Sequence, residues 1–267
     1  MKTILYSLSL LLIFSTIVIS CSSNISEPVP DSNKKGNLKV EFEHFFGTET
    51  FELLKKMQLT DSITVTVDDF KYYVSNVVFV KSDGTNFVVP KDSSYFLIDV
   101  SKISTKSISI KSIPEGDYTS VTFILGIDSA KSVSPVGERT GVLDVAGDAK
   151  SLYWTWNSGY IFFAFEGSYS SPKVLNNTFK YHIGGFGGYN APNLNNIKTI
   201  TVPFGQTILK IREGKNPHLH ITADVSSIFK GDGAISIEAN PTVMFSPYSV
   251  NVANKYATMF QFGKIME

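Results

Sequence analysis

The chain has 267 residues, of which 43% are hydrophobic and 13% aromatic, and its 24 basic side chains balance 24 acidic ones to a formal net charge of zero. A chain of this length and composition can bury a substantial core. Binding to a phosphate backbone needs concentrated Lys and Arg, and the sequence has no basic cluster, so it argues against nucleic acid as a partner.

The N-terminus has the features of a secretion signal. Met1 and Lys2 precede an apolar run from Ile4 to Ile19, which is shorter than the ~20 residues that a spanning helix usually needs. We therefore predict a signal peptide over residues 1–20 in preference to a retained transmembrane helix.

Cys21 is the single cysteine of the chain and follows the predicted signal peptide directly. Branched apolar residues and a small residue before it resemble the lipobox of bacterial lipoproteins, which implies cleavage there and a lipid on Cys21. A free thiol is the alternative. The polar residues 21–37 have little to bury and are expected to form a flexible tether. The resemblance to lipoproteins also implies the outer membrane of a bacterial cell envelope, because Ser22 and not an aspartate follows the cysteine.

Alternation of apolar and polar residues dominates the chain from Leu38 onward. It predicts half-buried strands over 38–46, 63–67, 73–80, 87–89, 96–100 and 107–110. Two runs, 122–126 and 161–165, are apolar on both faces and are expected near the centre of packed sheets. Helical periodicity is scarce, and 50–58 and 253–261 are its best candidates. Together these patterns predict one all-β domain over residues 38–267, a mostly antiparallel β-sandwich with few short helices.

The strongest catalytic and cofactor signatures, such as HExxH, CxxC, GxGxxG, GxxxxGK[ST] and GxSxG, are missing from the sequence. We therefore expect a protein that is not an enzyme. Hydrolysis by paired carboxylates across a cleft is a distant alternative.

Two of the predicted strands place histidines at positions that suit a metal ligand. His44 shares the apolar face of its strand with Val40 and Phe42. Burying an imidazole costs free energy unless its nitrogens find partners, so His44 is either a metal ligand or a core histidine bonded to the backbone. His182 ends a strand that runs into a glycine-rich segment, where a ligand is well placed.

The other two histidines, His218 and His220, alternate with Leu219 and Ile221 and so share the opposite face of their strand. A pair spaced in this way can chelate a metal ion, and a solvated strand face is the more common alternative.

The segment SLYWTWNSGYIFFAFEG, residues 151–167, holds both tryptophans of the chain, Trp154 and Trp156. On a strand the two side chains would lie on one face. Burial statistics alone favour an aromatic plug in the core of a sandwich.

Six segments follow one another in an order that resembles the MbnP family of copper-binding periplasmic proteins and lipoproteins. They are His44 in an early strand, FKYYVSN at 70–76, GIDS at 126–129, GVLD at 141–144, WTWNSGY at 154–160 with EG at 166–167, and YHIGG at 181–185. The resemblance extends from about Leu38 to the last residues.

This resemblance implies copper as the cofactor. In some relatives the ligands are histidines and a tryptophan that a partner di-haem enzyme of the MauG type oxidises to kynurenine. His44 and His182 fall on the family's histidine positions, and Trp154 and Trp156 on its tryptophan motif. Opening an indole ring exposes an aromatic amine, and such a nitrogen together with imidazole suits copper. One tryptophan would then be a latent ligand.

Two functions therefore remain open. The first is a lipid-anchored copper protein for storage, scavenging or delivery, which requires His44, His182 and a tryptophan to converge. The second is a surface module that binds glycan or protein through Trp154, Trp156 and Tyr160, which requires exposed tryptophan rings.

Overall fold

The computed structural model describes residues 30–156 and 159–267. The signal peptide predicted for residues 1–20, the lipidation predicted at Cys21 and the predicted tether as far as residue 29 lie outside the described residues. Within the described ranges, no helix is both long enough and apolar enough to cross a membrane.

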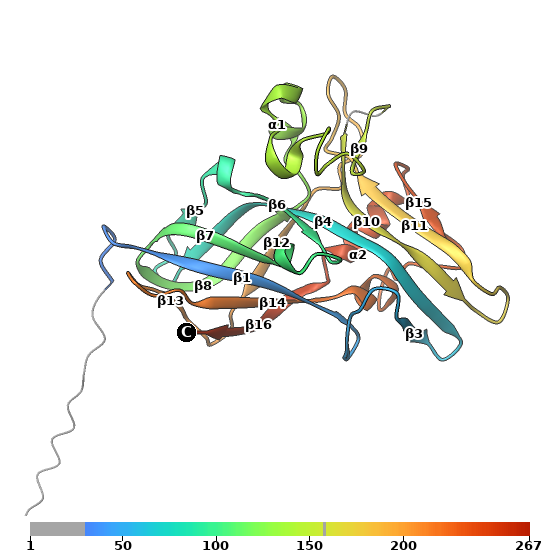
Figure 1. Ribbon diagram of the computed structural model, residues 1–267, viewed down its shortest axis with the longest axis horizontal. Helices are drawn as coiled ribbons and strands as arrows, with labels where there is room; N and C mark the ends of the chain where they lie inside the picture. Colours follow the sequence, from blue (N-terminus) through green and yellow to red (C-terminus); the bar gives the residue numbers. More distant parts are fainter. Residues whose placement is uncertain (1–29, 157–158) are drawn as a thin grey trace, which may run out of the picture.

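The strands form two curled sheets that pack against each other as a sandwich (Figure 1). The smaller sheet has the order β16-β14-β1-β2, and β7 also pairs with β1. Its strands are β1 (Lys35–Phe46), β2 (Glu49–Thr50), β7 (Ser107–Pro114), β14 (His218–Asp224) and β16 (Phe260–Met266).

The larger sheet has the order β12-β8-β4-β10-β11-β15, with shorter strands added to β8, β4 and β10. The strands along this path are β12 (Lys198–Pro203), β8 (Gly116–Leu125), β4 (Ile63–Lys81), β10 (Gly159–Ser170), β11 (Asn177–Gly184) and β15 (Thr242–Val243). The added strands are β13 (Leu209–Ile211) on β8, then β3 (Lys56–Thr60), β5 (Asn86–Val88) and β6 (Tyr95–Asp99) on β4, and β9 (Tyr153–Trp154) on β10.

Among the described strands, β1 with β14 and β11 with β15 pair in parallel, and the other pairings are antiparallel. The prediction of a mostly antiparallel all-β sandwich is therefore confirmed. The two runs predicted to be central lie in β8 and β10, which flank β4 on its two sides.

Helices are short, as predicted, but one expected helix is wrong. The described helices are α1 (Ser129–Ser132), α2 (Ser249–Tyr256) and the 3₁₀ turns η1 (Lys91–Ser93), η2 (Ile103–Thr105), η3 (Val136–Glu138), η4 (Gly141–Leu143) and η5 (Val225–Phe229). Over 50–58 the chain forms the end of β2 and the start of β3 instead of a helix. Leu54 has a φ of 63°, and Met57 and Leu59 are buried with a period of two, so the segment cannot continue as a helix. Over 253–261 the helix ends at Tyr256, and β16 begins at Phe260.

Two strand boundaries also differ from the pattern. β1 begins at Lys35, three residues before the expected start at Leu38, because Lys35 and Gly36 pair with β7. The strands expected over 63–67 and 73–80 are one 19-residue strand, β4. A register shift against β8 between Ser75 and Val78, where Asn76 has a φ of 51°, interrupts the pairing without ending the strand.

The space between the sheets is filled by aromatic rings. Phe42 of β1 meets the rings of Tyr72, Phe123 and Phe260 edge-on, with centroids 6.0–6.3 Å away. Such edge-to-face contacts add to the free energy gained by burying the rings. The inner faces of both sheets are therefore largely apolar, with His44 of β1 as an exception. Charged side chains of β1, β10 and β11, such as Glu41, Glu166 and Lys180, lie on the outer faces.

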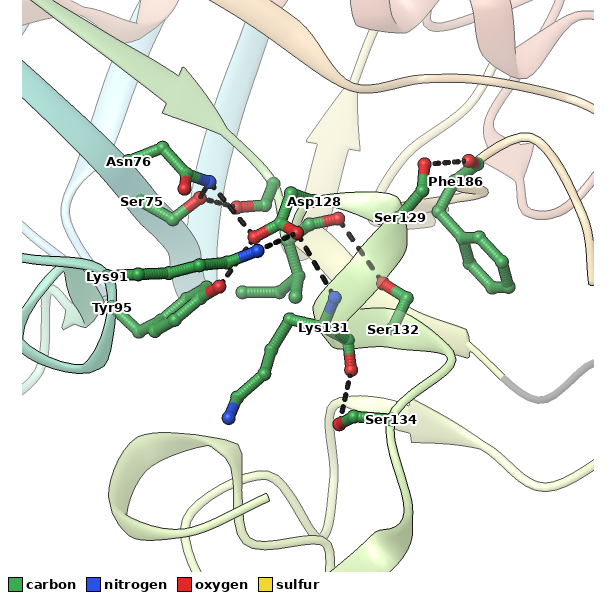
Figure 2. Close-up of polar contacts among 12 residues, drawn as sticks. Ser75, Asn76, Lys91, Tyr95, Asp128, Ser129, Lys131, Ser132, Ser134 and Phe186 are labelled. Carbon is green, nitrogen blue, oxygen red and sulfur yellow. Dashed lines mark hydrogen bonds and ion pairs between the residues drawn. The ribbon is translucent and has the colours of Figure 1, made fainter. Parts of the chain in front are cut away.

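A network around Asp128 attaches α1 to the larger sheet (Figure 2). The Asp128 carboxylate accepts hydrogen bonds from Asn76 Nδ2 at 3.1 Å, Tyr95 Oη at 2.5 Å, Lys91 Nζ at 3.0 Å and the backbone N–H of Lys131 at 3.1 Å. Burial opposes ionisation, but these hydrogen bonds outweigh it and lower the pKa of Asp128 to about 2.

The same helix is tied to the glycine-rich segment that follows β11. Ser129 Oγ, in the first turn of α1, donates to the carbonyl of Phe186 at 2.7 Å (Figure 2). The Asp128 network thereby fixes the position of the loop that borders the tryptophan pair.

Candidate functional site

The two tryptophans lie in contact, although only one of them is on a strand. Trp154 ends β9, whereas Trp156 lies in the turn between β9 and β10, so the prediction of one strand through both residues is wrong. The ring centroids are 5.4 Å apart with the planes inclined at 42°, and Phe245 meets both rings edge-on. Trp154 is 5% exposed and Trp156 is 65% exposed. The pair therefore reaches from the protein interior to the solvent.

Gly184 makes room for the buried tryptophan. A Cβ atom on this residue would lie 2.8 Å from Cζ3 of Trp154 and 2.3 Å from the carbonyl oxygen of Tyr160. Only glycine permits so close an approach of ring and backbone. The glycine of the YHIGG segment thus explains how Trp154 packs against the end of β11.

A buried arginine contacts β9 and β10, the two strands that flank the turn of Trp156. Arg139 Nη1 donates to the Tyr153 hydroxyl at 2.9 Å, and Nη2 donates to the Tyr189 hydroxyl at 3.3 Å. The guanidinium also lies 5.5 Å from the ring centroid of Tyr153 and 5.8 Å from that of Tyr160, within the range of cation–π attraction. Arg139 therefore links β9 and β10 to the glycine-rich loop.

His182 lies on the outer face of the larger sheet, where its ring is 14% exposed. It sits opposite Ala164 of β10, and its Nε2 hydrogen-bonds to Oε1 of Glu166, whose Oε2 lies 3.2 Å from Lys180 Nζ. Burial favours the neutral carboxyl, but the bonds to His182 and Lys180 outweigh it and lower the pKa of Glu166. An ionised carboxylate thus orients the imidazole.

His182 and the tryptophan pair share one region of the sheet. His182 and Gly184 are two residues apart on β11, so they lie on the same face about 7 Å apart along the strand. Trp154 packs directly on Gly184. The structure therefore brings these two predicted site elements to the same end of the same face.

His44 lies on the opposite side of that sheet, in the core. It is 5% exposed, its Nε2 is 2.9 Å from the Tyr72 hydroxyl, and the rings of Phe70 and Tyr72 flank it. Its Nδ1 is buried and has no hydrogen-bond partner among the residues that the structure describes. Burial, assisted by the charge of Lys106, lowers the pKa of His44 to about 3, so the imidazole is neutral at ordinary pH.

The strand faces separate the two histidines. His44 contacts Phe70, which packs on Phe163 and Phe165 of β10, so these rings mark the inner face. Ala164 and its partner His182 alternate with them and lie on the outer face. His44 and His182 therefore do not share one coordination sphere in this structure.

The two remaining histidines do converge with an acidic residue. His218 and His220 of β14 and Glu41 of β1 each place a donor atom within 4.8 Å of the others, the one such group of three or more His, Cys, Asp or Glu within residues 30–156 and 159–267. Glu41 was not among the residues that the sequence singled out. The available signal was its place on the polar face of β1. The parallel pairing that puts Glu41 opposite His220 joins strands far apart in the sequence and leaves no local pattern.

A pocket of about 220 Å³ adjoins the tryptophan pair. Its walls include the backbone of Gly185 and Gly188 and the rings of Phe186, Tyr189 and Phe245. Phe245 also contacts both tryptophans, so a ligand in this pocket would lie against a ring that the pair itself touches.

Comparisons with known proteins agree with the resemblance in the sequence. The MbnP family model matches residues 35–245, so the chain belongs to the MbnP family. Among solved structures, MbnP from Methylosinus trichosporium aligns with 71% of this chain and 76% of its own, at 14% sequence identity and a TM-score of 0.46. No curated protein sequence matches the chain.

Proposed function

We propose that this member of the MbnP family binds copper without catalysing a reaction, in storage, scavenging or delivery within the bacterial cell envelope. The observation that carries the proposal is the placement of His182 and the Trp154–Trp156 pair at one end of the outer face of the larger sheet. His44 is left out of this ligand set, because the sheet lies between it and His182.

The residues present offer copper one nitrogen ligand as they stand, and a second after one modification. His182 offers an imidazole that Glu166 already orients, which is the arrangement found behind many metal-bound histidines. Oxidation of one tryptophan to kynurenine would add an aromatic amine, a nitrogen donor that the intact indole lacks. When bound, copper would prefer such nitrogen ligands.

The exposure of the pair favours Trp156 as the residue that meets an oxidising partner. A di-haem enzyme of the MauG type could contact Trp156, which is 65% exposed, while Trp154 lies beneath it with ring centroids 5.4 Å apart. The proposal therefore makes Trp156 the entry point for oxidation and leaves either ring as the final kynurenine.

The place of action in this proposal follows from the N-terminal sequence. A lipid on Cys21 would anchor the protein to a membrane. Ser22, which follows the cysteine, makes the outer membrane the proposed location. The tether would hold the sandwich in the aqueous phase. The neutral charge balance leaves nucleic acid outside the expected partners. Mass spectrometry of the detergent-extracted N-terminal peptide would test the lipid on Cys21.

Peptide mass spectrometry and copper quantification on one sample of native protein test the ligand set. We expect the mass change of a tryptophan-to-kynurenine conversion at residue 154 or 156, and loss of the bound copper in His182→Ala. The matched control is His44→Phe, which changes the inner face and should retain copper. Intact tryptophans together with copper binding that is indifferent to His182 would overturn the proposal.

One observation favours a second candidate function. The exposed ring of Trp156 and the adjoining pocket of about 220 Å³ form an aromatic surface that suits a glycan or an aromatic side chain of another protein. A panel of soluble oligosaccharides titrated by tryptophan fluorescence would test it. Binding that Trp156→Ala abolishes, in protein with unmodified tryptophans, would favour this function over copper.

A further inference from the structure

The outer face of the smaller sheet carries a second cluster of metal-binding side chains, far from the tryptophans in the fold. β1 and β14 pair in parallel, with Lys39 opposite His218 and Glu41 opposite His220. β1 buries its even-numbered residues in the core, Phe42 for example, and β14 its odd-numbered apolar residues, such as Ile221. Glu41, His218 and His220 therefore all project outward. The strands lie side by side, while β9 belongs to the other sheet (Figure 1).

The donor atoms of this cluster are close enough for one ion. One atom from each of Glu41, His218 and His220 lies within 4.8 Å of the other two. Metal–ligand bonds of about 2.0–2.2 Å place ligands closer together than this, so small side-chain rotations complete the coordination. Glu41 and His218 are only partly buried and have room for that movement.

His220 is oriented in the manner of a metal ligand. Its Nδ1 lies 2.6 Å from Oε1 of Glu43, and a carboxylate can only accept, so the proton of the neutral imidazole resides on Nδ1. The lone pair of Nε2 is then free to bind a cation. A carboxylate that fixes the tautomer of a histidine in this way is the usual partner behind a metal-bound imidazole.

The second nitrogen of His220 has no partner although it is buried. His220 is 5% exposed, and its Nε2 makes no hydrogen bond with any described residue. An unsatisfied polar atom in such a place destabilises the fold, whereas a solvated histidine on a strand face would not. A bound cation would satisfy it.

The surroundings leave the cluster open to an ion. Lys39 lies 3.4 Å from Oε2 of Glu41 but is itself 39% exposed, so it can move away. Ser107, opposite Glu41 on β7, has a buried hydroxyl without a hydrogen-bond partner among the described residues. A water molecule in the fourth coordination position of the metal would be able to hydrogen-bond to this hydroxyl.

We propose that Glu41, His218 and His220 form a binding site for a divalent first-row transition metal, Zn²⁺ or Cu²⁺, with Glu43 as the positioning residue. Two imidazoles and one carboxylate suit either ion. The site is independent of the tryptophan pair, needs no modified residue and goes beyond the copper site on the other sheet.

Isothermal titration of the metal-stripped full chain in detergent tests the site, with Zn²⁺ as the probe and Cu²⁺ as its competitor. We expect one equivalent of Zn²⁺ to bind, displaceable by Cu²⁺. His218→Ala and His220→Ala should weaken binding by at least about 100-fold, and Glu43→Gln by about 10–100-fold, as loss of an orienting partner does.

Matched controls separate this site from the one proposed at His182. Thr222→Ala changes the same outer face two residues beyond His220 and should leave Zn²⁺ affinity unchanged, as should His182→Ala. If His182→Ala loses copper but keeps its Zn²⁺ affinity, the result supports the copper site at His182 and shows that the Zn²⁺ site is separate from it. Zn²⁺ binding that is absent from the parent protein, or that persists in His218→Ala, overturns the second.

A spectroscopic measurement guards against variants that fold poorly. His218 is partly exposed, so His218→Ala is expected to fold, and its thermal transition is the check. Electron paramagnetic resonance of His182→Ala protein loaded with one equivalent of Cu²⁺ should show coupling to two imidazole nitrogens, and to one after His218→Ala. Equal nitrogen coupling in the two samples would contradict the assignment.

Discussion

The inner and outer faces of the β1–β14 pair carry two histidines that are buried to the same extent. His44 and His220 are each 5% exposed. Within residues 30–156 and 159–267, each has one ring nitrogen in a hydrogen bond and one that is buried without a partner. His44 projects between the sheets, where its partner is the hydroxyl of Tyr72. His220 projects outward, where its partner is the carboxylate of Glu43.

The difference between them lies in the neighbouring donors. Around His44 there are aromatic rings, and burial lowers its pKa to about 3, so it behaves as a neutral core side chain. Around His220 there are a second imidazole and two carboxylates. Both histidines are thus buried with one unsatisfied ring nitrogen. What distinguishes a metal site from a packed histidine is the presence of further ligand side chains beside it.

The largest expected effect comes from placing a charge on the inner face. His44→Asp should lower the free energy of unfolding by about 3–5 kcal/mol, because a carboxylate among aromatic rings is uncompensated. Urea denaturation measures the loss. His218→Asp, on the partly exposed outer face, is the matched control and should cost much less. Equal losses at the two positions would contradict the contrast between the faces.

The second-largest expected effect is the contribution of His44 to the pH dependence of stability. Its pKa falls from an ordinary value of 6.5 to about 3 on folding, so the unfolded chain binds more protons between these values. The contribution of His44 to stability is therefore fully present above pH 6.5 and is lost progressively as the pH falls toward 3, by about 2 kcal/mol at pH 5.

A comparison with His44→Phe separates the contribution of His44 to the pH dependence of stability from that of the titrating carboxylates. Denaturation of both proteins at pH 7.5 and pH 5 should show a smaller acid-induced loss in the variant. Parallel pH profiles would mean that His44 keeps its ordinary pKa.

Removing the hydroxyl of Tyr72 should have a moderate effect. Tyr72→Phe leaves both nitrogens of His44 without partners and should cost about 1–2 kcal/mol. In the His44→Phe background, Tyr72→Phe should cost less, because the imidazole that bonds to the Tyr72 hydroxyl is absent. Thermal or urea denaturation of the four proteins completes the cycle, and strict additivity would argue against the hydrogen bond.

The smallest effect on stability is expected on the outer face. Glu43→Gln keeps an acceptor oxygen for Nδ1 of His220 and replaces a carboxylate that is 33% exposed. In the absence of metal it should change the free energy of unfolding by less than about 1 kcal/mol. A loss of several kcal/mol in metal-free protein would mean that Glu43 is primarily a structural residue.

The sequence predicted the architecture well because alternation reports directly on burial. The strands containing Phe42, Val78 and Ile98 follow from period-two patterns. The central runs in β8 and β10 follow from being apolar on both faces. It failed over 50–58, where the apolar spacing of Phe51, Leu54 and Met57 is also compatible with a helix and the positive φ of Leu54 leaves no trace in the sequence.

The candidate sites were predictable only in their separate parts. The pattern placed His44 on the apolar face and His218 and His220 on the polar face of their strands, and the structure agrees with both placements. It could not tell that His182 and His44 lie on different sides of one sheet, since that depends on how β4, β10 and β11 are paired.

The sequence alone therefore determined the strand content, the sides on which side chains lie along each strand and, through its ordered motifs, membership of the MbnP family. These properties depend on neighbouring residues in the chain. Only the tertiary structure decided which strands are adjacent, and so which donors meet. Because strand partners such as β1 and β14 are brought together by burial of a shared core and not by any local signal, the pairing of Glu41 with His220 exists only in the folded protein.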